Sequence, residues 1–120
     1  RDLRMSRGLG DVYKRQMMNR EIEAHYAQYL FLQRSAEWTD KKQDKYAKSQ
    51  RLRATTSLTK YVNQQGHVTT SFLDIFETYI SNNVVNAFRQ EGYDNYPFKE
   101  YSDITNIFPN IKLTTKNCDE

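Results

Sequence analysis

Apolar residues recur at helical spacing between Ser71 and Gln90, SFLDIFETYISNNVVNAFRQ, more clearly than anywhere else in the chain. Steps of three and four residues put them on one side of a helix. Ser71 and Asp74 fit a capping pattern at its start, and Gly92 can end it. The main apolar stripe contains Leu73, Phe76, Ile80, Val84, Ala87 and Phe88.

Four residues of this segment predict where the helix lies in the fold. Ile75 and Val85 fall off the main stripe, so the helix is apolar more than halfway round, which is typical of a central position. Asn83 falls inside the stripe, and we expect neighbouring elements to satisfy a buried amide there. Glu77 borders the stripe, where we expect its carboxylate to reach water.

Two further helices are predicted before this one. Asn19 can cap a helix that runs to about Trp38 and is apolar on two nearly opposite sides. Such a helix usually lies between two neighbours or in an oligomer contact. Thr39 or Asp40 can cap a second helix, which runs through about Asn63 and has a thin apolar side.

The chain becomes aromatic after the third predicted helix. We expect this loop to fold back over the helices, and base stacking is the alternative because Lys99 lies among the rings. Asp103 or Ser102 can cap a short fourth helix, Ile104 to Phe108, which Pro109 ends. The aromatic residues of the loop are Tyr93, Tyr96, Phe98 and Tyr101.

Residues 1–16 differ from the rest because they have no apolar periodicity. Asp11–Gln16, DVYKRQ, can be encoded by GAT-GTG-TAT-AAG-AGA-CAG, which closely resembles the mosaic end of transposase-based sequencing libraries. Ser6–Gly10, SRGLG, continues the adapter in the same reading frame. We therefore interpret residues 1–16 as a non-native, adapter-derived and disordered segment of a metagenomic fragment. A basic N-terminal arm or a transit peptide is the alternative.

The fold class predicted for the remainder is all-α, a small bundle of three main helices plus a short C-terminal helix. Residues 17–113 form the single helical domain, and residues 114–120 form a polar tail. The only cysteine, Cys118, lies in that tail, so no disulfide framework is expected. No apolar run approaches the roughly 20 residues of a membrane span, and the default localisation is cytoplasmic, although a fragment can lack native N-terminal residues.

Charge is unevenly distributed along the chain. The full sequence has 18 basic and 15 acidic residues, but residues 1–16 contain five of the basic and two of the acidic ones. The remainder is therefore neutral, and the overall basicity is no evidence for nucleic-acid binding. Between Asp40 and Lys60, however, seven basic and two acidic residues give a local charge of +5.

Six of these basic residues would share one face of a continuous helix, within an arc of about 140° at 100° per residue. Cations at helical spacing can meet successive phosphates of a nucleic acid. A solvated face turned toward the acidic C-terminal half or a partner is the alternative. The candidate nucleic-acid-binding residues are Lys41, Lys42, Lys45, Lys48, Arg53 and Lys60.

No constellation of residues predicts catalysis. Neither His25 nor His67 has a partner at metal-ligand spacing, and we interpret His25 as structural. Asp74 and Glu77 form an i, i+3 carboxylate pair, but no nucleophile or further acid–base group accompanies them. The sequence therefore predicts no catalytic, cofactor-binding or metal-binding residue, and we expect a protein that is not an enzyme and has no cofactor.

The twelve residues Tyr79–Gln90, YISNNVVNAFRQ, resemble the core helix of region 2 of the sigma factors, in which aromatic and small residues precede a similar Asn-Ala-Phe run. The flanking sequence lacks the upstream acidic and aromatic pattern of that family. The resemblance implies transcription-related DNA binding as one possible activity.

Two functions of different classes follow. The first is a non-enzymatic interaction or structural module that binds a protein partner or a second copy of itself, because the first and third helices are apolar on more than one side. The alternative is a nucleic-acid-binding accessory protein that uses the basic face of the second helix. No membrane partner is expected.

Overall fold

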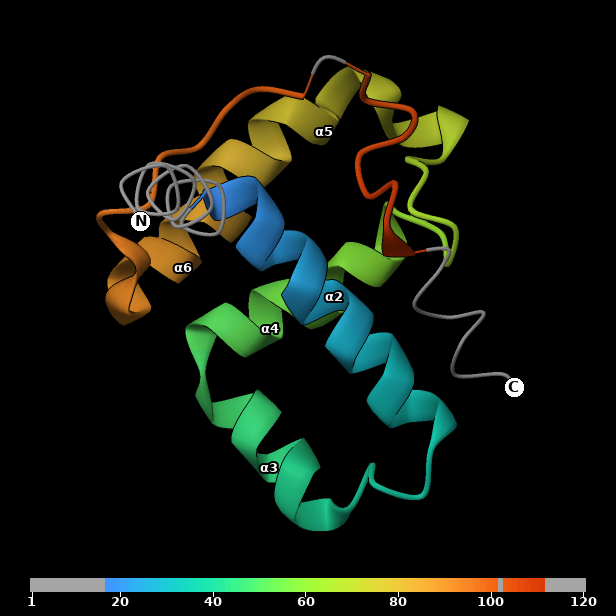
Figure 1. The fold of residues 1–120 in the computed structure, drawn as a ribbon, viewed down its shortest axis with the longest axis vertical. Coiled ribbons are helices and arrows are strands. Elements are labelled where there is room, and N and C mark those ends of the chain that lie inside the picture. The colour runs from blue at the N-terminus through green and yellow to red at the C-terminus, as the bar shows by residue number, and fades with distance from the viewer. Residues whose placement is uncertain (1–16, 102, 112–120) are drawn as a thin grey trace, which may run out of the picture.

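The computed structural model describes residues 17–101 and 103–111. These residues are mostly helical and contain no β-strand, which confirms the all-α class (Figure 1). The proposed adapter-derived segment and the polar tail lie outside the described residues.

The first helix is α2, Met18–Arg34. Its first apolar side, with Ile22, Tyr26, Tyr29 and Leu30, is buried, but on the opposite side Ala24 is exposed and Phe31 is half-buried. It begins after Met17, so the expectation that Asn19 caps it is wrong. The Asn19 side chain instead makes a pair of hydrogen bonds with the backbone of Lys99, donating to its carbonyl at 2.6 Å and accepting from its N–H at 2.9 Å. The helix ends at Arg34 rather than near Trp38 because Ser35 has an extended backbone.

The second predicted helix is broken in two, which corrects the expectation of one helix to Asn63. The structure has α3, Asp40–Lys48, then α4, Gln50–Ser57, and a 3₁₀ turn η1, Leu58–Lys60. Ser49 is extended between α3 and α4, and its side chain accepts a hydrogen bond from the N–H of Leu52. Serine competes with the helix in this way because its hydroxyl satisfies a free N–H of the next helix.

The third predicted helix is present and contains two wide turns. A 3₁₀ turn η2, Thr70–Phe72, leads into α5, Leu73–Tyr79, without the side-chain cap expected from Ser71. The π-helical η3, Ile80–Val85, follows, then α6, Asn86–Phe88, and the π-helical η4, Arg89–Tyr93. The helical backbone stops at Gly92, as predicted, where φ is +102°.

The π turns change which residues of this helix are buried. Phe76, Ile80, Val84 and Phe88 recur every fourth residue, a spacing that drifts by about 40° per step in a regular helix of 3.6 residues per turn. A π turn holds more residues and removes most of this drift, so all four point into the core.

Two expectations for this helix are wrong. Asn83 is exposed rather than buried, so its amide needs no partners in the core, and Ile75 is 52% exposed, so the helix is not enclosed on its far side. Val85, which falls off the main stripe of a regular helix, is only 3% exposed. Glu77 is exposed, as predicted, and the helix is solvated along one side.

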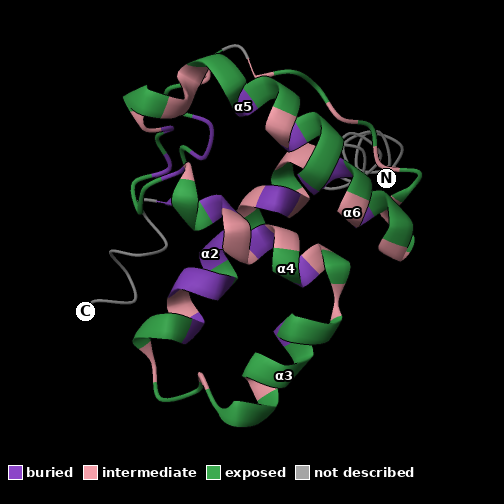
Figure 2. Cartoon of the chain, turned by 180° about the vertical axis from the view of Figure 1, so that it is seen from behind, coloured by how far each residue is buried: buried purple, intermediate pink, exposed green. Residues whose placement is uncertain are grey.

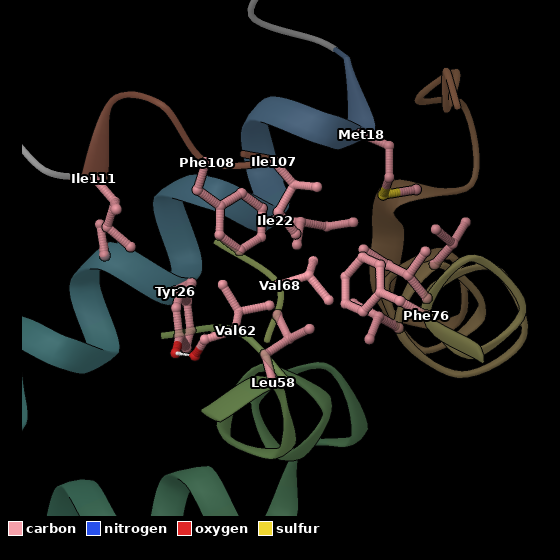
Figure 3. Packing of buried hydrophobic residues seen from close by; sticks show 14 of the residues in the cluster. Met18, Ile22, Tyr26, Leu58, Val62, Val68, Phe76, Ile107, Phe108 and Ile111 are labelled. Carbon is pink, nitrogen blue, oxygen red and sulfur yellow. Dashed lines mark hydrogen bonds between the residues drawn. The ribbon is translucent and has the colours of Figure 1, made fainter. Parts of the chain in front are cut away.

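The main core forms where α2 meets η1, the α5–α6 helix and the C-terminal segment (Figure 3). Met18, Ile22 and Tyr26 enter it from α2, and the hydroxyl of Tyr26 donates to the carbonyl of Val62 at 2.5 Å. Purple, buried segments accordingly gather around α2 and α4, whereas α3 is mostly green (Figure 2).

The predicted short helix Ile104–Phe108 is absent; these residues form turns. The N–H groups of Ile107 and Phe108 are bonded to the carbonyl of Gly66, at 3.0 and 3.2 Å, instead of to carbonyls of their own turn. Gly66 has φ +83°, and a Cβ there would lie 2.3 Å from the carbonyl oxygen of Phe108. Glycine is thus required for this close approach.

The aromatic loop after Gly92 covers the helices, as expected. All four of its aromatic residues are partly buried and pack against the main core. The N–H of Met18 also donates to the carbonyl of Pro97 at 2.8 Å, which fixes the loop beside the start of α2.

Because the π turn buries Val85 and exposes Asn83, substitutions at these two positions should differ in their effect on stability. Val85→Ala should lower the free energy of unfolding by about 1.5–3 kcal/mol, because it removes buried methyl groups and leaves a cavity. Asn83→Ala should change it by less than about 0.5 kcal/mol, as at other exposed positions. Urea denaturation of both variants checks this, and a larger loss for Asn83→Ala would contradict the register.

Candidate functional site

The residues from Asp40 to Ser57, which we call the basic arm, form α3 and α4. α4 packs against α2 and the main core, and α3 extends away from that core. α3 lies at one end of the molecule, far from α5 (Figure 1). Only Tyr46 of α3 is buried, so most of this helix is in solvent. Three lysines, Lys41, Lys45 and Lys48, are exposed on this one helix.

The break at Ser49 divides the six candidate nucleic-acid-binding residues. Lys41, Lys45 and Lys48 are exposed on α3 and Lys42 is half-buried there, whereas Arg53 lies on α4 and Lys60 on η1. The single arc calculated for one continuous helix therefore does not hold across the break. The structure brings the four lysines together on α3.

A second, smaller hydrophobic cluster fixes α3 against α2. Tyr46 packs against Tyr29 of α2, with ring centroids 5.6 Å apart, and against Trp38, at 5.2 Å. Leu32 and Leu52 complete the cluster from α2 and α4. Because aromatic pairs of this kind add to the burial of apolar area, the arm has a defined position despite its exposure.

A cleft of about 340 Å³ lies between α2, α3 and α4, and we call it the α2–α4 cleft. Its apolar lining comes mainly from the second cluster, through Leu32, Tyr46 and Leu52. Two of the candidate residues, Lys42 and Lys45, line it from α3. The cleft therefore combines an apolar wall with cations that the sequence had singled out.

Polar side chains complete the lining from the other two helices. Glu21, His25 and Gln28 come from successive turns of α2, and Arg51 comes from α4. With Lys42 and Lys45 from α3, the lining holds three cationic side chains and one carboxylate. This balance favours an anionic ligand.

Arg51 belongs to a network that joins three helices. Its Nε lies 3.4 Å from Oε1 of Glu91, its guanidinium donates to Nε2 of His25, and its Cζ lies 5.5 Å from the ring centroid of Tyr93. Nδ1 of His25 in turn donates to the carbonyl of Glu21 at 2.7 Å. Because Nε2 accepts a hydrogen bond and Nδ1 donates one, the His25 imidazole is neutral and carries its proton on Nδ1.

Glu91 also joins the start of α4 to the end of the third helix. Its carboxylate accepts from Ser49 Oγ at 2.5 Å and from the N–H of Gln50 at 2.6 Å. Desolvation raises the pKa of Glu91, but these hydrogen bonds and those from Arg51 outweigh it, so the pKa is lowered overall. A carboxylate at the start of α4 accepts hydrogen bonds from N–H groups that have no partner within the helix, and its negative charge interacts favourably with the positive end of the helix dipole.

Burial lowers the pKa of His25. The hydrogen bond to the Glu21 carbonyl offsets part of this lowering, and the nearby Arg51 charge adds a smaller lowering. The ring packs edge-on against Phe88, with centroids 4.7 Å apart. These partners fit the structural role that the sequence suggested for His25.

Sequence reasoning missed the network as a unit. In the sequence, Arg51 is distinguished only by its part in the local charge, and no pattern distinguishes Glu91. Ser49 is the one local signal of the break, because serine is a preferred residue at the N-cap, immediately before the first residue of a helix. Nothing local pointed to Glu91, which lies 42 residues away from Ser49.

Within residues 17–101 and 103–111, no three histidine, cysteine, aspartate or glutamate side chains come together in a way that could hold a metal ion. In the same part of the chain, no helix has the length and apolar character needed to cross a bilayer.

Comparisons of the chain with models of protein families, with curated proteins and with solved structures find no match. The functional argument therefore rests on the geometry of the arm and the cleft.

The His25 environment predicts a specific pH dependence of stability. The unfolded chain binds the imidazole proton at an ordinary pKa of about 6.5, whereas the folded ring binds it only at lower pH. The stabilisation by the neutral ring is therefore complete above that ordinary value and is lost as the pH falls through the folded pKa. His25→Gln should flatten the fall in unfolding free energy between about pH 7.5 and pH 5.

The matched control is His67→Gln, because His67 is exposed. Denaturant titrations at several pH values should give His67→Gln the same slope of unfolding free energy against pH as the parent protein. An unchanged slope for His25→Gln would contradict the assignment of a buried neutral imidazole.

Proposed function

We propose that this protein is a non-enzymatic binding module that uses its basic arm to bind nucleic acid. The observation that carries the proposal is the exposed lysine group of α3 beside a cleft that is itself lined by cations. In this view the chain is a small bundle: α2 and the helix from Leu73 to Gln90 are the scaffold, and α3 with α4 supplies the contact surface.

The charge of the arm supports this choice. Between Asp40 and Arg53 the chain has six basic and two acidic residues, a local charge of +4. Among the described residues, one ion pair of α3 links Lys48 Nζ to Asp44 at 3.0 Å, and both side chains are well exposed. Such exposed pairs are worth little and do not prevent a lysine from meeting a phosphate.

Self-association loses part of the pattern that suggested it. The first apolar side of α2 is covered within the chain by the main core and the second cluster, whereas the opposite side leaves Ala24 exposed and Phe31 half-buried. The third helix is solvated along one side, where Ile75 is the exposed large hydrophobic residue of the described part of the chain. Stable protein interfaces usually need a larger apolar centre than one such residue.

The test is the double variant Lys41→Glu/Lys45→Glu, measured by fluorescence anisotropy with a labelled oligonucleotide at several salt concentrations. If both lysines meet phosphates, the slope of log affinity against log salt should shrink by about 1.4 on a single strand and about 1.8 on a duplex. Affinity at low salt should fall at least about tenfold, because the new carboxylates also repel the phosphates.

The control is a charge reversal far from the arm, Lys99→Glu in the aromatic loop, where the lysine side chain is exposed. All variants are made in the full chain, so the basic residues of positions 1–16 contribute equally to each measurement. The proposed function is wrong if the arm variant binds as tightly as the parent. It is also wrong if the loss of affinity per reversed charge is no larger in the arm variant than in Lys99→Glu.

A further inference from the structure

We propose that the α2–α4 cleft receives one unpaired base of a single-stranded nucleic acid. This inference rests on the proposed function and adds to it the form of the strand that the protein prefers. It predicts that bases, and not phosphates alone, contribute to affinity.

The size of the cleft suits a single nucleotide unit. Its volume of about 340 Å³ lies at the lower end of the range of about 300–1,000 Å³ that is typical of small-ligand pockets. A duplex or a protein helix is too wide to enter such a space, whereas a base that has left its stack presents a flat, mostly apolar body. The apolar part of its lining comes from Leu32, Leu52 and the ring of Tyr46, which reach the cleft with only 2–7% of their surface exposed.

Polar groups on α2 can meet the edge of a base. Glu21 is half-buried and offers carboxylate oxygens, and Gln28 is exposed and offers both a donor and an acceptor. Base edges present donors and acceptors of these kinds. Arg51 is bonded to His25 and to Glu91, so these two side chains form a fixed end of the cleft, and Glu21 and Gln28 remain for recognition.

Lysine side chains lie beside the cleft, where the phosphates on either side of an inserted base would be. Lys42 and Lys45 line the cleft from α3, and Lys41 and Lys48 continue the positive charge along the same helix outside it. A strand that inserts one base can therefore lay its neighbouring phosphates along α3. Apolar or aromatic contacts to a base combined with a cationic track for the backbone are typical of single-strand binding.

A single strand is favoured over a duplex for an energetic reason. In a duplex the base is stacked and paired, so it must first be extruded, at a cost that an unpaired base does not incur. The arm alone would attract both forms through their phosphates. The cleft should therefore add affinity for single strands only.

The first experiment blocks the cleft without changing charge. Ala24 is exposed and lines the cleft, so Ala24→Phe fills it without entering the core. Ala47→Phe is the matched control, because Ala47 is also exposed and lies on α3 outside the lining. Affinities of the full chain for an oligonucleotide and for the corresponding duplex are measured with both variants.

Ala24→Phe should weaken single-strand binding by about tenfold, the usual size of one base contact, and leave duplex binding within about twofold. Ala47→Phe should leave both affinities within about twofold of the parent. Equal effects of the two variants, or an equal loss on the duplex, would overturn the inference.

The second experiment uses Trp38, the only tryptophan of the chain, as a reporter of the cleft. Its ring lies 5.2 Å from that of Tyr46, which lines the cleft. Titration with a single-stranded oligonucleotide should change Trp38 fluorescence, whereas an abasic oligonucleotide of equal length should not. The same response to both, or no response to either, would show that no base enters.

The two proposals fail separately. If Lys41→Glu/Lys45→Glu binds as tightly as the parent, the proposed function itself is wrong. If that variant loses affinity while Ala24→Phe behaves like Ala47→Phe, nucleic-acid binding by the arm stands and base insertion is wrong.

Discussion

The carboxylate of Glu91 is the constraint on which the shape of the candidate site depends. It accepts hydrogen bonds from Ser49 and Gln50 at the break between α3 and α4, and it lies 3.4 Å from Arg51. This contact ties the end of the third helix to the start of α4 and holds Arg51 against His25 of α2. Without the break, α3 and α4 would be one straight rod, and α3 could not turn back along α2 to enclose a cleft.

α2 supplies the second half of the arrangement, because it is shared by both hydrophobic clusters. Ile22 and Tyr26 enter the main core, and Tyr29 and Leu32, on an adjoining part of the helix surface, pack against the basic arm. A single helix thus places a rigid core directly beside a polar cleft.

The sequence could predict the elements that follow from local periodicity and could not predict those that depend on distant contacts. The helices around residues 18–34 and 73–90, the aromatic cover and the lysines of α3 all follow from spacing and composition. The break at Ser49 does not, since it is stabilised by Glu91, 42 residues later. Nor do the burial of Val85 and the exposure of Asn83, because π turns shift the helical wheel that any such prediction assumes. Of the cleft, the sequence indicated Lys42 and Lys45 but not the Arg51 network that forms its far end.

The most direct test asks whether Glu91 positions the arm for binding. Glu91→Ala removes a negative charge, so electrostatics alone predicts tighter binding of a single-stranded oligonucleotide. Asp94→Ala makes the same charge change at a nearby exposed position and serves as the reference. Circular dichroism first checks that both variants are folded. We then expect Glu91→Ala to bind the single strand more weakly than the parent, and Asp94→Ala to bind it as tightly or slightly more tightly. Equal or tighter binding by Glu91→Ala would contradict this expectation.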